Sequence, residues 1–150
     1  MRTCGVEIKG SEILLCLLSK EEDVFDIRDV RQTRFTLSNS HDAEQVKKFQ
    51  FDFNKLLEDY QVDTVAIKQR PHNGKFAGSA VGFKMETAIQ LIDSINVVLL
   101  SANDIKDQLK RNPLPIDFES TGLKKFQESA FISAYVEIME RTYPRSHSED

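Results

Sequence analysis

The sequence has little of several features that would assign it to a specialised class of protein. It has two cysteines and no tryptophan among 150 residues, and neither cysteine belongs to a Cys-x-x-Cys or Cys/His array, so we expect no structural zinc site. Its longest unbroken apolar run covers only residues 13–18, far short of the roughly 20 residues that a membrane-spanning helix needs. Basic residues are not in excess, because 20 Lys and Arg stand against 24 Asp and Glu. This balance excludes a protein that is basic over its whole surface, but not a local basic patch.

The two cysteines, Cys4 and Cys16, bear on the compartment. No secretory signal is readable in the sequence, so we expect a cytoplasmic protein with reduced thiols. If residues 9–11 form a three-residue hairpin loop, Cys4 lies opposite Cys16 and the thiols are cross-strand neighbours. We favour two small core side chains, and a redox pair is the alternative.

Hydrophobic spacing predicts one domain over residues 1–143, followed by a flexible tail at 144–150. The predicted strands are 3–9, 11–19, 24–37, 63–68 and 96–100, and the predicted helices are 42–60, 79–93, 103–111 and 121–142. Residues 69–78 contain proline, Asn-Gly and glycine, which is typical of a loop. Three strands in hairpin order, followed by alternating helices and strands, predict a mixed α/β fold: a five-stranded mixed sheet with helices on both faces.

Three segments carry a resemblance to a known family: CGVEIKG at 4–10, DTVAIKQRPHNGKFAGSAVG at 63–82 and FQESAFISA at 126–134. In this order they resemble the ribonuclease-H-like superfamily, and more closely its Holliday-junction-resolvase branch. The whole chain resembles a small bacterial family of proteins of unknown function with that fold. For the resolvases, the resemblance implies clustered carboxylates that hold two divalent metal ions and activate water.

The resemblance places Glu7, Lys68 and Glu128 at positions where the resolvases carry catalytic acids. Glu7 keeps an acid, one methylene longer than the usual aspartate, but Lys68 brings an ammonium, which repels divalent cations and offers no lone pair. Glu128 keeps an acid, whereas Lys125 and Phe131 stand three residues away on either side. We therefore expect a degenerate site that holds no metal. Magnesium or manganese would be needed only if the protein were a nuclease.

We expect Glu7, Lys68 and Glu128 to form an ion cluster, with a Glu7–Lys68 salt bridge at its centre. Two alternatives remain. In one, the site is a re-purposed pocket in which Lys68 binds an anion or acts as a base. In the other, the two acids retain hydrolysis with a single metal ion.

Positive charge is concentrated in the middle of the chain, because residues 68–125 hold 9 basic and 6 acidic side chains. Arg70, His72, Lys75 and Ser79 are the candidate ligand-binding residues of the loop that precedes the second helix. Free amides at a helix start, next to Arg70 and Lys75, favour an anion such as phosphate. A solvated basic loop is the plainer interpretation of the same residues.

Three functions agree with these patterns. The first is a non-catalytic binding module that holds nucleic acid or a phosphate-bearing ligand through the basic loop at 68–75. The second is a metal-dependent, resolvase-like nuclease that acts on structured nucleic acid, and the third is a phosphate-ligand module built on 68–82. We favour the first, because Lys68 occupies an acid position, and so we lean against an enzyme. We expect no membrane partner, and a homo-oligomer is compatible with the sequence.

Overall fold

The structure is a computed structural model that describes residues 1–74 and 77–144. The strands are β1 (Arg2–Lys9), β2 (Glu12–Glu21), β3 (Val24–Arg28), β4 (Arg34–Thr36), β5 (Thr64–Lys68) and β6 (Asn96–Leu100). The helices are α1 (Ala43–Asp59), α2 (Ala80–Gln90), α3 (Ala102–Arg111) and α4 (Glu128–Thr142), with 3₁₀ turns at Phe118–Thr121 and Lys125–Gln127. The predicted mixed α/β class is confirmed. The predicted tail lies almost wholly outside the described residues.

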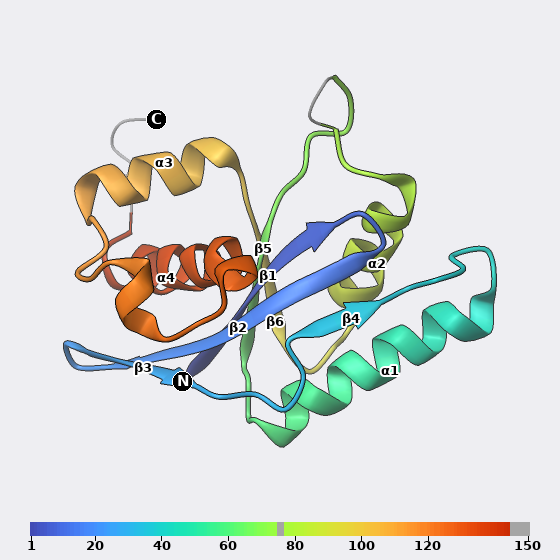
Figure 1. Cartoon of the computed structure of the whole chain (residues 1–150), viewed down its shortest axis with the longest axis horizontal. Helices are drawn as coiled ribbons and strands as arrows, with labels where there is room; N and C mark the ends of the chain where they lie inside the picture. The colour runs from blue at the N-terminus through green and yellow to red at the C-terminus, as the bar shows by residue number, and fades with distance from the viewer. Residues whose placement is uncertain (75–76, 145–150) are drawn as a thin grey trace.

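The sheet has the strand order β3-β2-β1-β5-β6, and β4 also pairs with β2 (Figure 1). The β1–β2 pair is antiparallel, whereas the β1–β5 and β5–β6 pairs are parallel. The sheet has six strands rather than five, because the predicted strand 24–37 divides into β3 and β4, which pair with opposite halves of β2. The interruption has a physical cause at Arg31. Its amide N–H donates to the Tyr60 hydroxyl at 2.9 Å, and its guanidinium pairs with Asp59 at 2.8 Å, which draws this stretch toward the end of α1.

The β1–β2 turn differs from the predicted three-residue loop. Lys9 pairs with Glu12, so Gly10 and Ser11 form a two-residue turn, and Gly10 adopts a φ of 60°. A glycine with positive φ at the first central position is typical of a tight hairpin turn. The shorter loop moves the register by one residue, so Cys16 lies opposite Gly5 and not opposite Cys4.

The cysteines consequently occupy different hydrophobic clusters, one on each face of the sheet. Both are buried free thiols. The prediction that they are core side chains is confirmed, and the conditional cross-strand neighbourhood is wrong, because successive residues of a strand point to opposite faces. Burial raises the pKa of the Cys16 thiol to about 12 and that of Cys4 well above its ordinary value.

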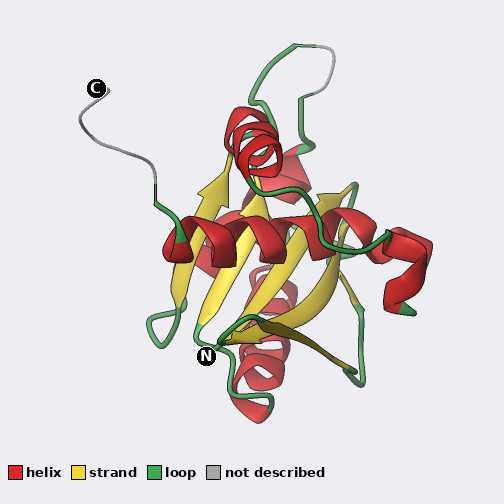
Figure 2. Cartoon of the chain, turned by 90° about the vertical axis from the view of Figure 1, so that its left-hand side faces the viewer, coloured by secondary structure: helices red, strands yellow, loops and turns green. Residues whose placement is uncertain are grey.

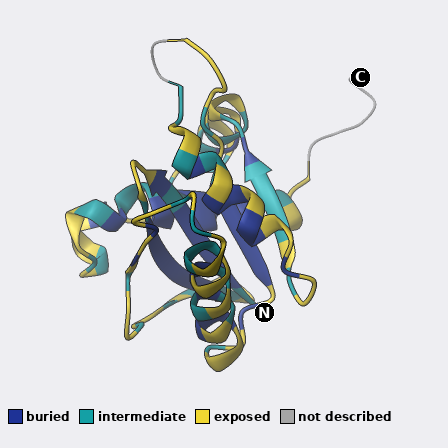
Figure 3. Ribbon diagram, turned by 90° about the vertical axis from the view of Figure 1, so that its right-hand side faces the viewer, coloured by how far each residue is buried: buried dark blue, intermediate teal, exposed yellow. Residues whose placement is uncertain are grey.

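Helices cover both faces of the sheet. On one face, α1 and α2 bury apolar side chains against the strands, and the central strands are buried beneath them (Figure 3). On the other face, α4 lies across the sheet and α3 packs against α4 (Figure 2). No helix in the described part of the chain is both long enough and apolar enough to cross a membrane.

The last helix begins later than the sequence predicts. Residues 121–127 are not α-helical: Gly122 has a φ of 78°, and a 3₁₀ turn precedes α4, which begins at Glu128. The Gln127 amide donates to the carbonyl of Leu15 in β2 at 3.0 Å, which fixes the start of α4 over the sheet. The predicted helix includes residues 121–127 because apolar residues of this segment, such as Leu123, also pack against the core and continue the apolar spacing of α4.

α4 approaches β1 closely where it passes Gly5. A Cβ atom at this position would lie 1.9 Å from the carbonyl oxygen of Ala130 and 2.8 Å from the amide nitrogen of Ala134. Because real Cβ atoms do not approach backbone this closely, only glycine fits here. Gly5 lies two residues before Glu7, so this contact also fixes how α4 lies relative to the predicted site.

Candidate functional site

The predicted site lies where the parallel strands β1 and β5 end. Thr3 and Gly5 contact α4, so Glu7 points to the same face by alternation along β1. Ala66 of β5 belongs to the hydrophobic cluster that contains the buried residues of α4. Lys68 is two residues farther along β5, so its side chain points to the same face of the sheet. Because Val6 pairs with Ile67, the next residues of the two strands are Glu7 and Lys68. The structure therefore brings these two residues onto neighbouring strands, as the resemblance predicts.

The predicted Glu7–Lys68 salt bridge is not formed. Among residues 1–74 and 77–144, no ion pair within 4.0 Å joins Lys68 to Glu7 or to Glu128. Glu128 is instead paired with Lys125, whose ammonium lies 2.7 Å from its carboxylate. The physical reason is that Glu7 and Lys68 are only partly buried at the strand ends, so water can solvate both charges without a direct contact.

Lys125 places a positive charge beside Glu128 at the start of α4, where a metal centre would need negatively charged ligands. Its hydrogen bond to Glu128 raises the pKa of the Lys125 ammonium, so the amine stays protonated beside the carboxylate. The predicted site residues thus form two groups of unlike charge: Glu7 and Lys68 lie on neighbouring strands, and Glu128 pairs with Lys125 at the start of α4.

These residues do not fit the two-metal centre that the resemblance would imply. Such a centre needs several oxygen ligands that converge from different strands. Within the described part of the chain, no group of three or more His, Cys, Asp or Glu side chains is placed to hold a metal ion. The sequence expectation that no metal is held stays a prediction.

The connection between β5 and α2 carries the predicted ligand-binding residues. Its described parts, 69–74 and 77–79, extend beyond the ends of β1 and β5 (Figure 1). His72 is exposed and packs edge-on against the Phe83 ring, with 4.8 Å between ring centroids. Arg70 is partly buried, and Lys75 lies outside the described residues.

Ser79 is the N-cap of α2, and its hydroxyl has two structural partners. It accepts a hydrogen bond from the Gly82 amide at 3.0 Å and donates to the carbonyl of Gly10 at 3.0 Å. The first bond satisfies a free amide of the helix start, and the second ties α2 to the β1–β2 turn. The role of Ser79 in holding a ligand stays a prediction. Its hydroxyl could not donate to a ligand without giving up its bond to the carbonyl of Gly10.

A pocket of about 290 Å³ lies between the β1–β2 turn, this connection and the first two turns of α2. We call it the hairpin pocket. Its lining residues are Glu7, Ile8, Lys9, Gly10, Arg70, Ala77, Gly78, Ser79, Gly82, Phe83 and Glu86. It joins one predicted site acid, Glu7, to two predicted ligand-binding residues, Arg70 and Ser79.

Glu86 is the member of this pocket that the sequence did not identify. It is 7% exposed, and one of its carboxylate oxygens is buried without a hydrogen-bond partner. Burial raises the pKa of the Glu86 carboxyl, and the nearby His72 opposes that rise. The available signal was modest: Glu86 is the first acid after Lys68, and it follows Gly82 and Phe83 at helical spacing on one face of α2.

Comparison with known proteins adds a family and a fold. The family model described as “Protein of unknown function (DUF3010)” matches residues 1–137, which is most of the chain. The chain belongs to this family. A search of the curated proteins finds no significant match. Membership of DUF3010 confirms the predicted resemblance to a family of unknown function.

Several solved structures that are similar to this DUF3010 domain are resolvases. Thermus thermophilus RuvC matches with a TM-score of 0.69 and 12% identity over 95% of this chain and 96% of that chain. T. thermophilus RuvC in complex with a Holliday junction substrate matches with a TM-score of 0.66 and 11% identity, over 96% of each chain. The Fowlpox virus resolvase with its substrate Holliday junction DNA matches with a TM-score of 0.55 and 11% identity, over 95% of this chain and 99% of that one. At these identities the similarity confirms the ribonuclease-H-like fold.

Proposed function

We propose that this domain binds structured nucleic acid, without hydrolysing it, through the edge of the sheet at which β1 and β5 end. The observation that carries the proposal is the charge of the residues there: Lys68 ends β5 beside Glu7 of β1, and at the start of α4 Lys125 pairs with Glu128. By the resemblance, Lys68 stands where the resolvases carry a metal-binding acid, and an ammonium group is suited to hold a phosphate.

The neighbouring cations support the same conclusion. Lys9 and Arg70 line one pocket, although they come from β1 and from the connection before α2. Lys68 directly precedes that connection, and His72 lies farther along it. These side chains therefore offer several phosphate contacts at one end of a molecule whose net charge is −4. A local basic surface of this kind binds nucleic acid in a salt-dependent manner.

The fold supports a four-way junction as the probe. Two of the similar resolvase structures were obtained with Holliday junction DNA. The likeness is one of fold, so the basic edge of this chain carries the proposal and the resolvases suggest the shape of the ligand. A cytoplasmic location would be consistent with such a partner.

The test is fluorescence anisotropy with labelled four-way-junction, duplex and single-stranded DNA over a range of salt concentrations. We expect binding that weakens with salt. A Lys68→Gln/Arg70→Gln variant should bind at least about tenfold more weakly, with a salt slope lower by about two, because two phosphate contacts are lost. The matched control is Lys47→Gln/Lys48→Gln, which removes the same charge from exposed positions of α1. No binding at low salt, or an equal loss in the control, would overturn the proposal.

One observation favours a nuclease as the second candidate. Glu7 has no ion-pair partner among the described residues, so its carboxylate remains available to a single divalent cation. Incubating the junction with protein and manganese tests this alternative. Cleavage that a Glu7→Gln variant abolishes would replace binding by hydrolysis as the function.

A further inference from the structure

The hairpin pocket contains a carboxyl group whose chemistry is incomplete. Glu86 is more than nine-tenths buried, yet one of its oxygens has no hydrogen-bond donor, and no salt bridge to it is formed within the described residues. A buried carboxyl without donors carries a desolvation penalty, so a protein does not gain stability from it. A ligand that brings N–H groups into the pocket would supply the missing partners.

The charges around the pocket restrict the chemistry of that ligand. Two acidic residues, Glu7 and Glu86, and two basic residues, Lys9 and Arg70, line the pocket. Because the acidic and basic residues are equal in number, the lining favours an occupant that brings no positive charge. A neutral group with adjacent N–H donors satisfies a carboxylate in bidentate fashion without bringing a further charge.

The walls of the pocket favour a flat, aromatic occupant. The Phe83 ring lines it, and His72 packs edge-on against that ring at an interplanar angle of 83°. The Arg70 stem lies against Gly78, because a Cβ atom on Gly78 would lie 2.8 Å from the Arg70 Cβ. Aromatic rings and guanidinium planes are the side chains on which nucleobases stack.

We propose that the hairpin pocket binds a guanine base, whose ring N–H and exocyclic amino group donate to the Glu86 carboxylate. Guanine presents two adjacent N–H donors on one edge, which is the pattern a carboxylate accepts. Adenine and cytosine place an acceptor beside their amino group and do not match. The phosphate attached to the nucleoside meets the Lys9 and Arg70 side of the pocket. The base belongs either to a free mononucleotide or to an unpaired guanine in a nucleic acid.

The experiment uses guanosine 5′-monophosphate (GMP) as the probe, in calorimetric titration of the full chain. We expect saturable binding, and weaker binding of inosine and adenosine monophosphates, because the first lacks the exocyclic donor and the second lacks both matching donors. The Glu86→Gln variant should bind GMP at least about tenfold more weakly, since an amide offers an acceptor for only one of the two N–H groups. Glu58→Gln on the exposed side of α1 is the matched control and should bind as the wild type does.

The outcomes separate this inference from the proposed function. Absence of GMP binding at millimolar concentration, equal binding of GMP and inosine monophosphate, or full binding by Glu86→Gln would each overturn the inference. An oligothymidylate with one internal guanine, compared with the all-thymidine oligonucleotide, distinguishes the two sources of the base. If GMP binds while four-way-junction DNA does not, the pocket inference stands and the proposed nucleic-acid function fails.

Discussion

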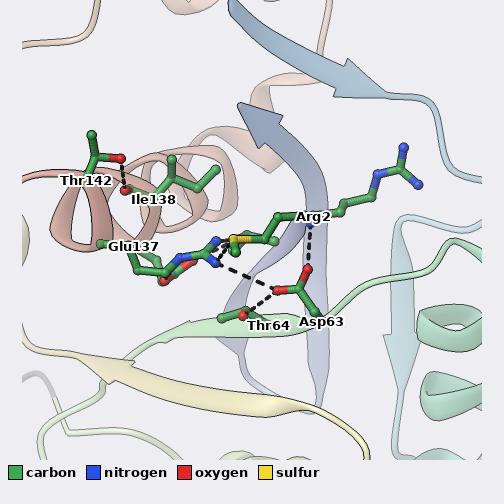
Figure 4. A network of polar contacts seen from close by, with 9 residues as sticks. Arg2, Asp63, Thr64, Glu137, Ile138 and Thr142 are labelled. Atoms are coloured by element: carbon green, nitrogen blue, oxygen red, sulfur yellow. Dashed lines mark hydrogen bonds and ion pairs between the residues drawn. The ribbon is translucent and has the colours of Figure 1, made fainter. Parts of the chain in front are cut away.

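The replacement of Arg141 by alanine tests how α4 is held at its C-terminal end. There the Glu137 carboxylate is 3% exposed, accepts a hydrogen bond from the Thr3 hydroxyl at 2.7 Å and pairs with the Arg141 guanidinium at 2.7 Å. Arg141 also donates to the Thr3 hydroxyl at 2.9 Å and approaches Asp63, which accepts from the Arg2 amide and from Thr64 (Figure 4). The two partners differ in exposure, because the Arg141 side chain is 31% exposed and that of Glu137 only 3%.

This difference predicts an asymmetric cost. The Arg141→Ala substitution leaves the buried Glu137 carboxylate with a single hydroxyl donor. Breaking a fully buried pair lowers the free energy of unfolding by about 3–5 kcal/mol, and we expect a loss of about 3 kcal/mol here because Arg141 is partly exposed. The Glu137→Gln substitution keeps a hydrogen-bond acceptor and lets Arg141 turn toward solvent, so we expect about 1 kcal/mol. The double variant should be more stable than Arg141→Ala alone, because no charge is then buried without a partner.

Urea unfolding followed by circular dichroism measures these differences in the free energy of unfolding. In thermal unfolding, the melting temperature of Arg141→Ala should lie roughly 6–12 °C below that of the wild type. The control is Arg111→Ala on α3, which breaks surface ion pairs and should cost less than about 1 kcal/mol. Two results would refute the reasoning. One is a double variant whose loss in the free energy of unfolding equals the sum of the two single losses, and the other is a loss in Arg141→Ala no larger than that in the Arg111→Ala control.

Three further outcomes are expected. The Gly5→Ala substitution should cost at least about 3 kcal/mol in urea unfolding, because its Cβ would meet the carbonyl of Ala130 and force α4 away from β1. Because the folded-state pKa of Glu86 is raised above its value of 4.5 in an unfolded chain, the native state binds the proton more tightly, and this contribution to stability is lost as pH rises through the folded pKa. Glu86→Gln should therefore gain stability relative to the wild type as pH rises from 4.5 to 7, and a constant difference between the two unfolding curves would contradict this. In the folded protein at pH 8, Cys4 and Cys16 should not react with a thiol reagent, because burial raises the pKa of both thiols. Both should react at the same pH after unfolding, and rapid labelling of the folded protein would contradict this expectation.

Much of the fold could be predicted from the sequence because its elements have strong local signals. The predicted strand at 96–100 and the predicted helix at 42–60 agree closely with β6 and α1, because the cap and the apolar spacing of α1 are local properties. The divided third strand could not be predicted in this way. Its interruption depends on Arg31 reaching Asp59, and no periodicity in 24–37 records a contact with a residue so far along the chain.

The candidate site shows the same limit at the level of side chains. The strand register brought Glu7 and Lys68 together as expected, since parallel pairing follows from the order of the elements. Whether the two charges meet depends on their solvation, which the sequence does not encode locally. Glu86 was missed because a carboxylate on a helix is normally solvent-exposed, and its burial results from how α2 packs against the β1–β2 turn.

The contact between α4 and β1 has a consequence for the order in which the chain can fold. The hydrogen bond from Thr3 to Glu137 spans 134 positions, so β1 is covered by a helix that is synthesised much later. During synthesis the Gly5 face of the sheet stays open until residues beyond 128 are available, and such late, long-range contacts slow folding. A ribosome-bound chain that stops before Glu128 should therefore expose this apolar face to chaperones, whereas the α1–α2 face can already be closed.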